Sequence, residues 1–347
     1  MIKSRSNALL MAQIDQNPPD PSIAFDPSVQ SEKIAFDVNE LLCCPSCARR
    51  NPPNRLGCLY CGAMLEVGQL EAAAVTRGFR SPEAWEPGIS LVSVPFQMDK
   101  TADLSAASRI LSLEFSVLNS ILQASVPLPL CRLATETEAF STKKLLSDIG
   151  IGSKVIDDKL LAADKPPMRL AELLFSANEL RMTAFNSRDQ LTIPSDEIVL
   201  LVEGVISISK VDQMEKRKGG KGQLQGEVST ISDEPILDIY SSTDNIGFRV
   251  LTSGFDFSCL GNEKRLIAAE NLKSLSGRLS SVCTNSRTIA EFPRLREPIG
   301  RVWEVELRRD TKGLQVTGFG KREIGRVLST NNLDQFTRFS RLQRLLV

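Results

Sequence analysis

The chain has 347 residues, of which 42 are Lys or Arg and 42 are Asp or Glu. This length suits about two or three domains, and the balanced charge gives no overall field that would attract nucleic acid or a membrane. The sequence contains no histidine, which excludes Ser-His-Asp and Cys-His catalytic systems and metal centres that use imidazole. It contains no apolar run long enough to span a membrane and no secretory signal core, so we expect a cytoplasmic protein without a transmembrane segment.

Residues 1–39 are rich in Pro, Asp, Ser and Gln and show little periodicity. A segment of this composition cannot bury enough apolar surface to offset the entropy of ordering it, so we predict a disordered tail. The folded part of the chain is therefore expected to begin near residue 40.

Two Cys-x-x-Cys pairs follow the tail, Cys44 with Cys47 and Cys58 with Cys61. Zinc takes four thiolates in a tetrahedron, and each pair forms a turn that presents two sulfurs to one side of the ion. We therefore predict one structural Zn²⁺ held by these four residues. Because four sulfurs leave no position for water, the site is not expected to be catalytic. Cys43 stands beside Cys44 and is an alternative first ligand. Disulfides between these cysteines are not expected, because a reducing cytoplasm disfavours them.

This double pattern resembles the zinc-ribbon family, in which two cysteine turns, or knuckles, clamp one zinc ion. The resemblance covers residues 43–66 and implies a small ribbon domain over residues 40–66. Gly62 follows the second pair, whereas Ala48 stands after the first pair, where the family commonly has glycine. The candidate contacts to nucleic-acid phosphate in the ribbon are Arg49, Arg50 and Arg55.

Residues 67–102 are first Ala-rich and then interrupted by prolines. This pattern indicates a linker with one short strand at residues 91–96 and with Trp85 as an apolar contact. Apolar residues recur at helical spacing in residues 103–126, which predicts a small helical hairpin. Its second helix has no Lys or Arg to bind phosphate, so we expect internal packing and not DNA binding.

Residues 127–168 predict a β-α-β unit, with strands at 128–133 and 154–156 around a helix at 135–149. Thr135 and Glu138 form a capping-box pattern at the start of this helix. The unit resembles half of a ferredoxin-like fold. No glycine-rich phosphate turn follows its first strand, so we expect no nucleotide site.

Residues 169–283 alternate short β-prone runs with turn residues and end in an amphipathic helix at 265–282. Gly204 interrupts the longest run and suggests a bulge or bend. The order of elements resembles a pleckstrin-homology-like domain, an antiparallel β-barrel with a capping helix. This resemblance implies a basic loop that binds anions, although such a charge run is also typical of a solvated hairpin loop. The candidate anion-binding residues are Lys216, Arg217, Lys218 and Lys221.

Residues 284–330 are basic and glycine-spaced. They predict a hairpin or linker in which residues 302–307 pair with residues 314–319 across a turn at 309–313. Residues 331–347 predict an amphipathic helix with an apolar stripe on one side and arginines on the other. We expect the stripe to pack onto the body of the protein, and the alternative is docking into a partner or onto an anionic surface.

Together these patterns predict an α+β multidomain chain. Its parts in order are a zinc ribbon, a helical hairpin, a ferredoxin-like β-α-β half, a pleckstrin-homology-like barrel with its helix, and a C-terminal helix. We predict that it is not an enzyme but an adaptor or regulatory protein that binds another protein. The alternative is a nucleic-acid-binding regulator that uses the ribbon and the basic C-terminal third. The order of segments is also similar to uncharacterised bacterial zinc-ribbon proteins, a resemblance that implies no activity.

Overall fold

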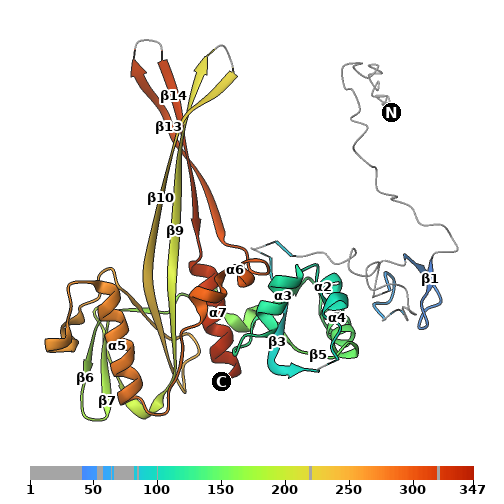
Figure 1. Cartoon of the computed structure of the whole chain (residues 1–347), viewed down its shortest axis with the longest axis horizontal. Helices are drawn as coiled ribbons and strands as arrows, with labels where there is room; N and C mark the ends of the chain where they lie inside the picture. Colours follow the sequence, from blue (N-terminus) through green and yellow to red (C-terminus); the bar gives the residue numbers. More distant parts are fainter. Residues whose placement is uncertain are drawn as a thin grey trace, which may run out of the picture. The chain divides into compact units, whose positions relative to one another are not determined.

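A computed structural model describes residues 41–52, 58–63, 65, 82–83, 86–99, 101–218, 221–318 and 321–347. The tail predicted for residues 1–39 lies outside the described residues, as do Arg55, Trp85 and most of the predicted linker. Figure 1 labels most of the helices and strands discussed below. Among the helices that the structure describes, none combines the length and the apolar character needed to cross a membrane.

The first sheet is small and lies in the predicted ribbon. Strands β1 (Leu42–Cys43) and β2 (Arg50–Asn51) pair antiparallel, with Leu42 opposite Asn51. A small apolar cluster of Cys44, Cys58 and Leu65 lies beside this sheet. The fold of the segment therefore depends on very little buried carbon, as expected for a unit stabilised by a metal ion.

A three-stranded sheet with three helices comes next. Its elements are β3 (Ile89–Met98), α2 (Leu104–Leu111), α3 (Phe115–Leu122), β4 (Pro129–Leu133), α4 (Glu136–Asp148) and β5 (Ile151–Asp157). The Thr135 hydroxyl caps α4 by accepting a hydrogen bond from the Glu138 N–H at 3.3 Å. The predicted hairpin helices and β-α-β elements are thus present. However, β3 is the central strand between β4 and β5 and is not part of a linker.

The remaining strands form one nine-stranded sheet. They are β6 (Met168–Phe175), β7 (Glu179–Ala184), β8 (Gln190–Pro194), β9 (Ile198–Lys218), β10 (Lys221–Ser241), β11 (Phe248–Leu251), β12 (Arg287–Ile289), β13 (Glu306–Gly318) and β14 (Lys321–Asn331). Their order is β13-β14-β9-β10-β11-β6-β7-β8, with β12 added beside β9. Among the described residues the sheet is open, so the expected closed barrel is wrong.

Helices cover both faces of this sheet at its base. Helix α5 (Ala268–Val282) contributes to an apolar core with Leu201 and Leu237, while α6 (Phe292–Gly300) and α7 (Leu333–Leu346) contribute to a second core with Leu200 and Val202. Neighbouring residues of β9 therefore enter different cores, because side chains alternate across a strand. Burial on both faces explains the unbroken apolar run at the start of β9.

Helix α7 packs internally, which confirms the first of the two alternatives for the C-terminal helix. Phe336, Phe339 and Leu342 are fully buried. The polar side of the helix also makes internal contacts, since Tyr240 Oη lies 2.8 Å from Ser340 Oγ. Arg341, expected on a solvent-facing side, is only 3 % exposed and donates to the carbonyls of residues 162 and 165.

Gly204 is a packing residue and not the predicted bulge. It pairs directly with Ile236 in β10, without a register shift at that point. A Cβ atom added to Gly204 would overlap the ring of Phe336 in α7. The glycine therefore lets the helix lie close to the strand, which is a common reason for glycine inside a β-strand.

The C-terminal third also differs from its prediction. Strands β13 and β14 are joined at residues 319–320, so the turn predicted at residues 309–313 is wrong. Helix α6 was not expected there, because Pro293 and Pro298 lie within it. Strand β14 pairs with β9 on the side away from β10. Figure 1 shows β9, β10, β13 and β14 continuing together beyond the helices.

A buried charge network around Asp158 joins the three-stranded sheet to α7. Asp158 accepts hydrogen bonds from Ser90 Oγ at 2.7 Å and from Arg132 Nε at 2.5 Å. Arg338 of α7 lies 3.5 Å from the same carboxylate. Both Asp158 and Arg132 have side chains only 6 % exposed. A buried carboxylate with these partners is strongly constrained, because removing one member would leave an unpaired charge.

Candidate metal centre

Two backbone turns of the same form build the centre. In the first turn the Ala48 N–H donates to the Cys44 carbonyl at 2.9 Å, and in the second the Gly62 N–H donates to the Cys58 carbonyl at 3.0 Å. Ala48 and Gly62 both have positive φ angles, 55° and 73°. Each turn therefore places its two cysteines on one side, and the two turns repeat the same local geometry.

The four predicted ligands come together. The sulfur atoms of Cys44, Cys47, Cys58 and Cys61 all lie within 4.8 Å of one another. The Cys44 and Cys61 sulfurs are 3.6 Å apart, and those of Cys47 and Cys58 are 3.4 Å apart. Sulfurs bound tetrahedrally to one zinc ion at about 2.3 Å would be about 3.8 Å apart. The cluster is therefore compatible with a zinc-binding site.

Cys43 lies outside this cluster. Its side chain is exposed, and its thiol is 3.5 Å from the carbonyl oxygen of Ala48. Cys44, in contrast, is buried among the other three thiols. The geometry thus favours Cys44 over the alternative Cys43 as the first ligand.

Asn51 connects the two turns. Its side chain is fully buried and donates to the Arg49 carbonyl at 2.9 Å and to the Cys58 sulfur at 3.5 Å. It also accepts a hydrogen bond from the Leu59 N–H at 2.8 Å. Partners of this kind orient metal ligands and fix their geometry. Nothing in the Cys-x-x-Cys spacing points to this role of Asn51.

The thiols of the cluster differ in pKa because their surroundings differ. Burial opposes ionisation of Cys58, but the N–H groups of Tyr60 and Cys61, with Asn51, lower its pKa to about 6. The N–H of Arg49 favours the thiolate of Cys47, whereas burial and the neighbouring sulfurs raise the pKa of Cys47 to about 12. Without a cation the cluster therefore resists ionising together, and a divalent metal ion would stabilise all four thiolates.

The ribbon also exposes apolar and basic side chains next to the thiols. Leu59 and Tyr60, between the two cysteines of the second turn, are 50 % and 56 % exposed. The guanidinium of Arg49 lies 4.7 Å from the centre of the Tyr60 ring, an arrangement typical of a cation–π contact. Arg49 and Arg50 are exposed, while the third predicted contact, Arg55, lies outside the described residues.

The four predicted anion-binding residues are at the end of a hairpin. Strand β9 ends at Lys218 and β10 begins at Lys221, and the backbones of these two residues pair. The segment thus lies at the end of a β-hairpin, which agrees with the alternative of a hairpin loop. The side chains of Lys216, Arg217, Lys218 and Lys221 lie outside the described ones.

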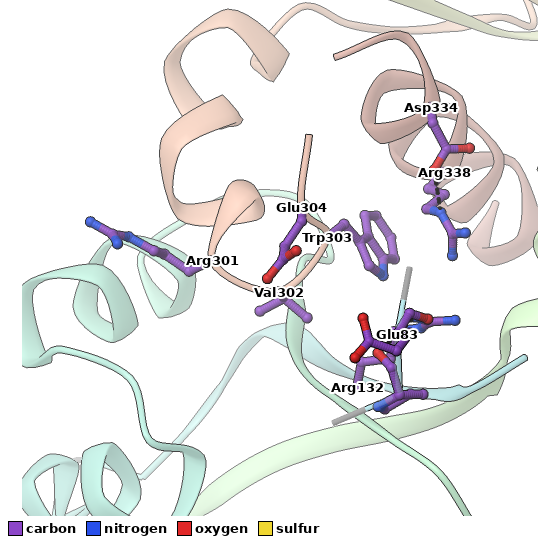
Figure 2. A pocket seen from close by; sticks show the side chains of 9 residues that line it. Glu83, Arg132, Arg301, Val302, Trp303, Glu304, Asp334 and Arg338 are labelled. Carbon is purple, nitrogen blue, oxygen red and sulfur yellow. Dashed lines mark hydrogen bonds and ion pairs between the residues drawn. The ribbon is translucent and has the colours of Figure 1, made fainter. Parts of the chain in front are cut away.

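A pocket next to the Asp158 network is the other candidate site (Figure 2). Its volume is about 200 Å³, and its lining residues are Pro82, Glu83, Arg132, Arg301, Val302, Trp303, Glu304, Asp334 and Arg338. Three arginines are balanced by three carboxylates in this lining. Arg132 is already occupied by Asp158 and by the carbonyls of residues 82, 83 and 86. The pocket therefore offers no clear preference for an anionic or a cationic ligand.

Replacing Ala48 with glycine is expected to stabilise the ribbon. A non-glycine residue in the left-handed region costs about 1–2 kcal/mol, and glycine removes this cost. Ala48→Gly should therefore raise the chelator concentration needed to unfold the ribbon, as followed by NMR signals of residues 42–63. Gly62→Ala, the matched change in the second turn, should have the opposite effect. If the two variants unfolded at the same chelator concentration, the assignment of backbone strain to positions 48 and 62 would be wrong.

Comparison with known proteins adds no family to this description. No protein-family model, curated protein sequence or solved structure matches the chain. The resemblance to a zinc ribbon therefore rests on the four clustered thiols and on the two turns that present them.

Proposed function

We propose that the protein is a non-catalytic zinc-ribbon adaptor that binds another protein through the second turn of its ribbon. Cys44, Cys47, Cys58 and Cys61 would hold one structural Zn²⁺. The observation that carries the proposal is the closed set of four thiols with Leu59 and Tyr60 exposed directly between two of them. A metal-stabilised turn presents these apolar side chains at low entropic cost, which favours binding.

The other cysteines support a role without catalysis. Burial raises the pKa of Cys131 to about 12 and the pKa of Cys283 to about 11. Thiols with pKa values this high stay protonated near neutral pH and are poor nucleophiles. No histidine is present to activate them.

The binding surface on the ribbon can be tested with two matched variants. Leu59→Ser combined with Tyr60→Ser removes the exposed apolar pair and keeps all four thiols. Leu160→Ser is the control, because Leu160 is 61 % exposed but lies in a short 3-10 helix remote in sequence. Affinity purification from native extract, followed by quantitative mass spectrometry, should show partners that the double variant loses and the control keeps. If the wild type, the double variant and the Leu160→Ser control all retained the same partners, the proposed surface would be refuted.

Nucleic-acid binding is the second candidate, because Arg49 and Arg50 are exposed and Arg49 lies over the Tyr60 ring. Stacking aromatics and arginines are typical of single-stranded nucleic-acid sites. Fluorescence anisotropy with labelled single- and double-stranded oligonucleotides would measure this directly. Affinity that falls steeply with salt and is reduced by Arg49→Ala would support this candidate, since phosphate contacts release counterions. No binding at low salt would exclude it.

A further inference from the structure

The four longest strands form an extended sheet without a core of its own. We name this region the arm and define it as residues 207–218, 221–235, 306–318 and 321–331 of β9, β10, β13 and β14. None of the arm side chains that the structure describes is buried. Val228, Ile231 and Leu307 are 66 %, 69 % and 49 % exposed. A sheet normally needs one covered apolar face to be stable, and no element among the described residues covers this arm.

The arm also has two free edges. Strand β13 is the last strand of the sheet, and nothing described pairs with its outer side. On the opposite edge, β11 pairs with β10 from Ile236 to Ile239, and Glu234 accepts hydrogen bonds from the Ser253 N–H and the Thr252 hydroxyl just after β11. The outer side of residues 221–233 is left without a described partner strand. Unpaired edges of this length are usually protected or used for association.

One residue at each edge differs in charge from the other edge. Residues 226–235 of β10 include Asp233 and Glu234 and contain no Lys or Arg. The facing edge, β13, carries Glu306, Arg308, Arg309 and Asp310. Arg308 lies 2.7 Å from Glu306, so Arg309 is the arginine that would meet an acidic strand. If β10 paired with another copy of β10, acidic residues would come together. Pairing of β10 with β13 instead brings opposite charges together, which favours this combination.

The strand directions allow this pairing between two copies. β13 runs antiparallel to β14, β14 antiparallel to β9, and β9 antiparallel to β10. Consequently β13 and β10 run in opposite directions. A twofold axis along the strands keeps these directions, so β10 of one copy and β13 of the other meet as antiparallel neighbours. Pairing between the copies would begin where Arg309 lies opposite Asp233, because Thr252 and Ser253 already contact Glu234.

One face of the arm suits the inside of such an assembly. Directly paired residues share a face, and successive rows alternate between faces. Two rows on one face are Arg309, Leu328, Val211 and Ser229, then Leu307, Thr330, Ser209 and Ile231. Two rows on the other face are Asp310, Val327, Asp212 and Val228, then Arg308, Ser329, Lys210 and Thr230, with four charged and two apolar residues. The first face is therefore the more apolar, and its Arg309 would meet Asp233 of the second copy.

We propose that two copies of this chain close their arms into one β-barrel, with β10 of each copy pairing with β13 of the other. The barrel would have eight strands, the size at which side chains just fill the interior. The face that carries Val211, Ile231, Leu307 and Leu328 lies inside. Closure pairs both edges of each arm and covers one face of each arm. One contact between copies therefore accounts for the unpaired edges, the missing core and the opposite charges of Arg309 and Asp233.

A charge-swap cycle on the full chain tests this assembly. Arg309→Asp and Asp233→Arg each place like charges opposite each other at both contacts of the dimer. The double variant restores opposite charges in the reverse sense. Sedimentation velocity over a range of protein concentrations should show a dimer for the wild type, a dissociation constant raised roughly tenfold or more in each single variant, and recovery in the double variant. Arg181→Asp on β7, an exposed arginine of the same sheet outside the arm, is the control and should remain dimeric.

The other outcomes of this cycle overturn the proposal. A wild-type chain that is monomeric at every concentration has no such assembly. Larger polymers would mean that the contact does not close. A dimer that survives both single changes, or that the double change fails to recover, uses another surface, such as a contact between two β13 strands. Circular dichroism and bound zinc, measured for every variant, ensure that only folded chains are compared.

Discussion

Replacing Cys44 with serine is expected to release zinc and unfold the ribbon, whereas replacing its neighbour Cys43 should do neither. The Cys44 thiol belongs to the four-sulfur cluster, and the Cys43 thiol is exposed outside it. Structural zinc contributes about 10–16 kcal/mol to the folding of small zinc domains. The ribbon has only a minimal apolar cluster to replace that contribution. Loss of one ligand should weaken zinc binding by more than about 100-fold, since even supporting partners of metal ligands matter by 10–100-fold.

Two measurements on the same samples check this expectation. Elemental analysis should find about one zinc per chain in the wild type and in Cys43→Ser, and much less in Cys44→Ser. NMR should show loss of the dispersed signals of the ribbon residues in Cys44→Ser, while signals from β9 to β14 remain. If Cys43→Ser lost zinc and Cys44→Ser kept it, the first ligand would have been assigned to the wrong residue. Zinc-free, folded wild-type protein would remove the metal from the proposal altogether.

Replacing Asp158 with alanine should produce a large loss of stability outside the ribbon. The change leaves the buried Arg132 guanidinium without its carboxylate partner and removes a contact to Arg338 of α7. Breaking one side of a buried ion pair typically costs about 3–5 kcal/mol. Thermal denaturation followed by circular dichroism should show a fall in Tm on the order of 10 °C.

Asp334→Ala is the matched control for this experiment. Asp334 also contacts Arg338, at 2.8 Å, but its side chain is 43 % exposed and the pair is separated by four residues on α7. Exposed pairs of this kind contribute about 0.3–0.5 kcal/mol. Replacing Arg132 and Asp158 together with apolar residues should cost less than the sum of the single changes, because no unpaired charge remains. Equal losses for Asp158→Ala and Asp334→Ala would show that burial of the network is unimportant.

Features set by neighbouring residues could be predicted from the sequence. The Cys-x-x-Cys spacing identified the four clustered thiols. The cap at Thr135 and the apolar stripe of α7 were also recognised, because turn geometry and helical periodicity are local properties. The choice between Cys43 and Cys44 needed the structure, since both positions satisfy a similar spacing.

The arm could not be predicted in the same way. Its strands are polar on much of both faces, so the alternation that marks a half-buried strand is missing from residues 207–218 and 221–235. The hairpin itself was one of the two alternatives for the basic run, and the pairing of Lys218 with Lys221 agrees with it. The barrel prediction was wrong for a related reason. The order of elements does not reveal that β9 takes β14 as its second neighbour.

The pairing of β9 with β14 has a consequence for how the chain acquires its structure. The Ser207 N–H donates to Asn332 Oδ1 at 2.7 Å, although these residues are 125 positions apart. Contacts between such distant segments form slowly, because a long loop must close first. During synthesis β9 and β10 can form their hairpin early, but β9 must wait for β14 to leave the ribosome. Until then the edge of β9 is unpaired, so the nascent chain can form incorrect strand pairs. We therefore expect chaperones to bind it during synthesis.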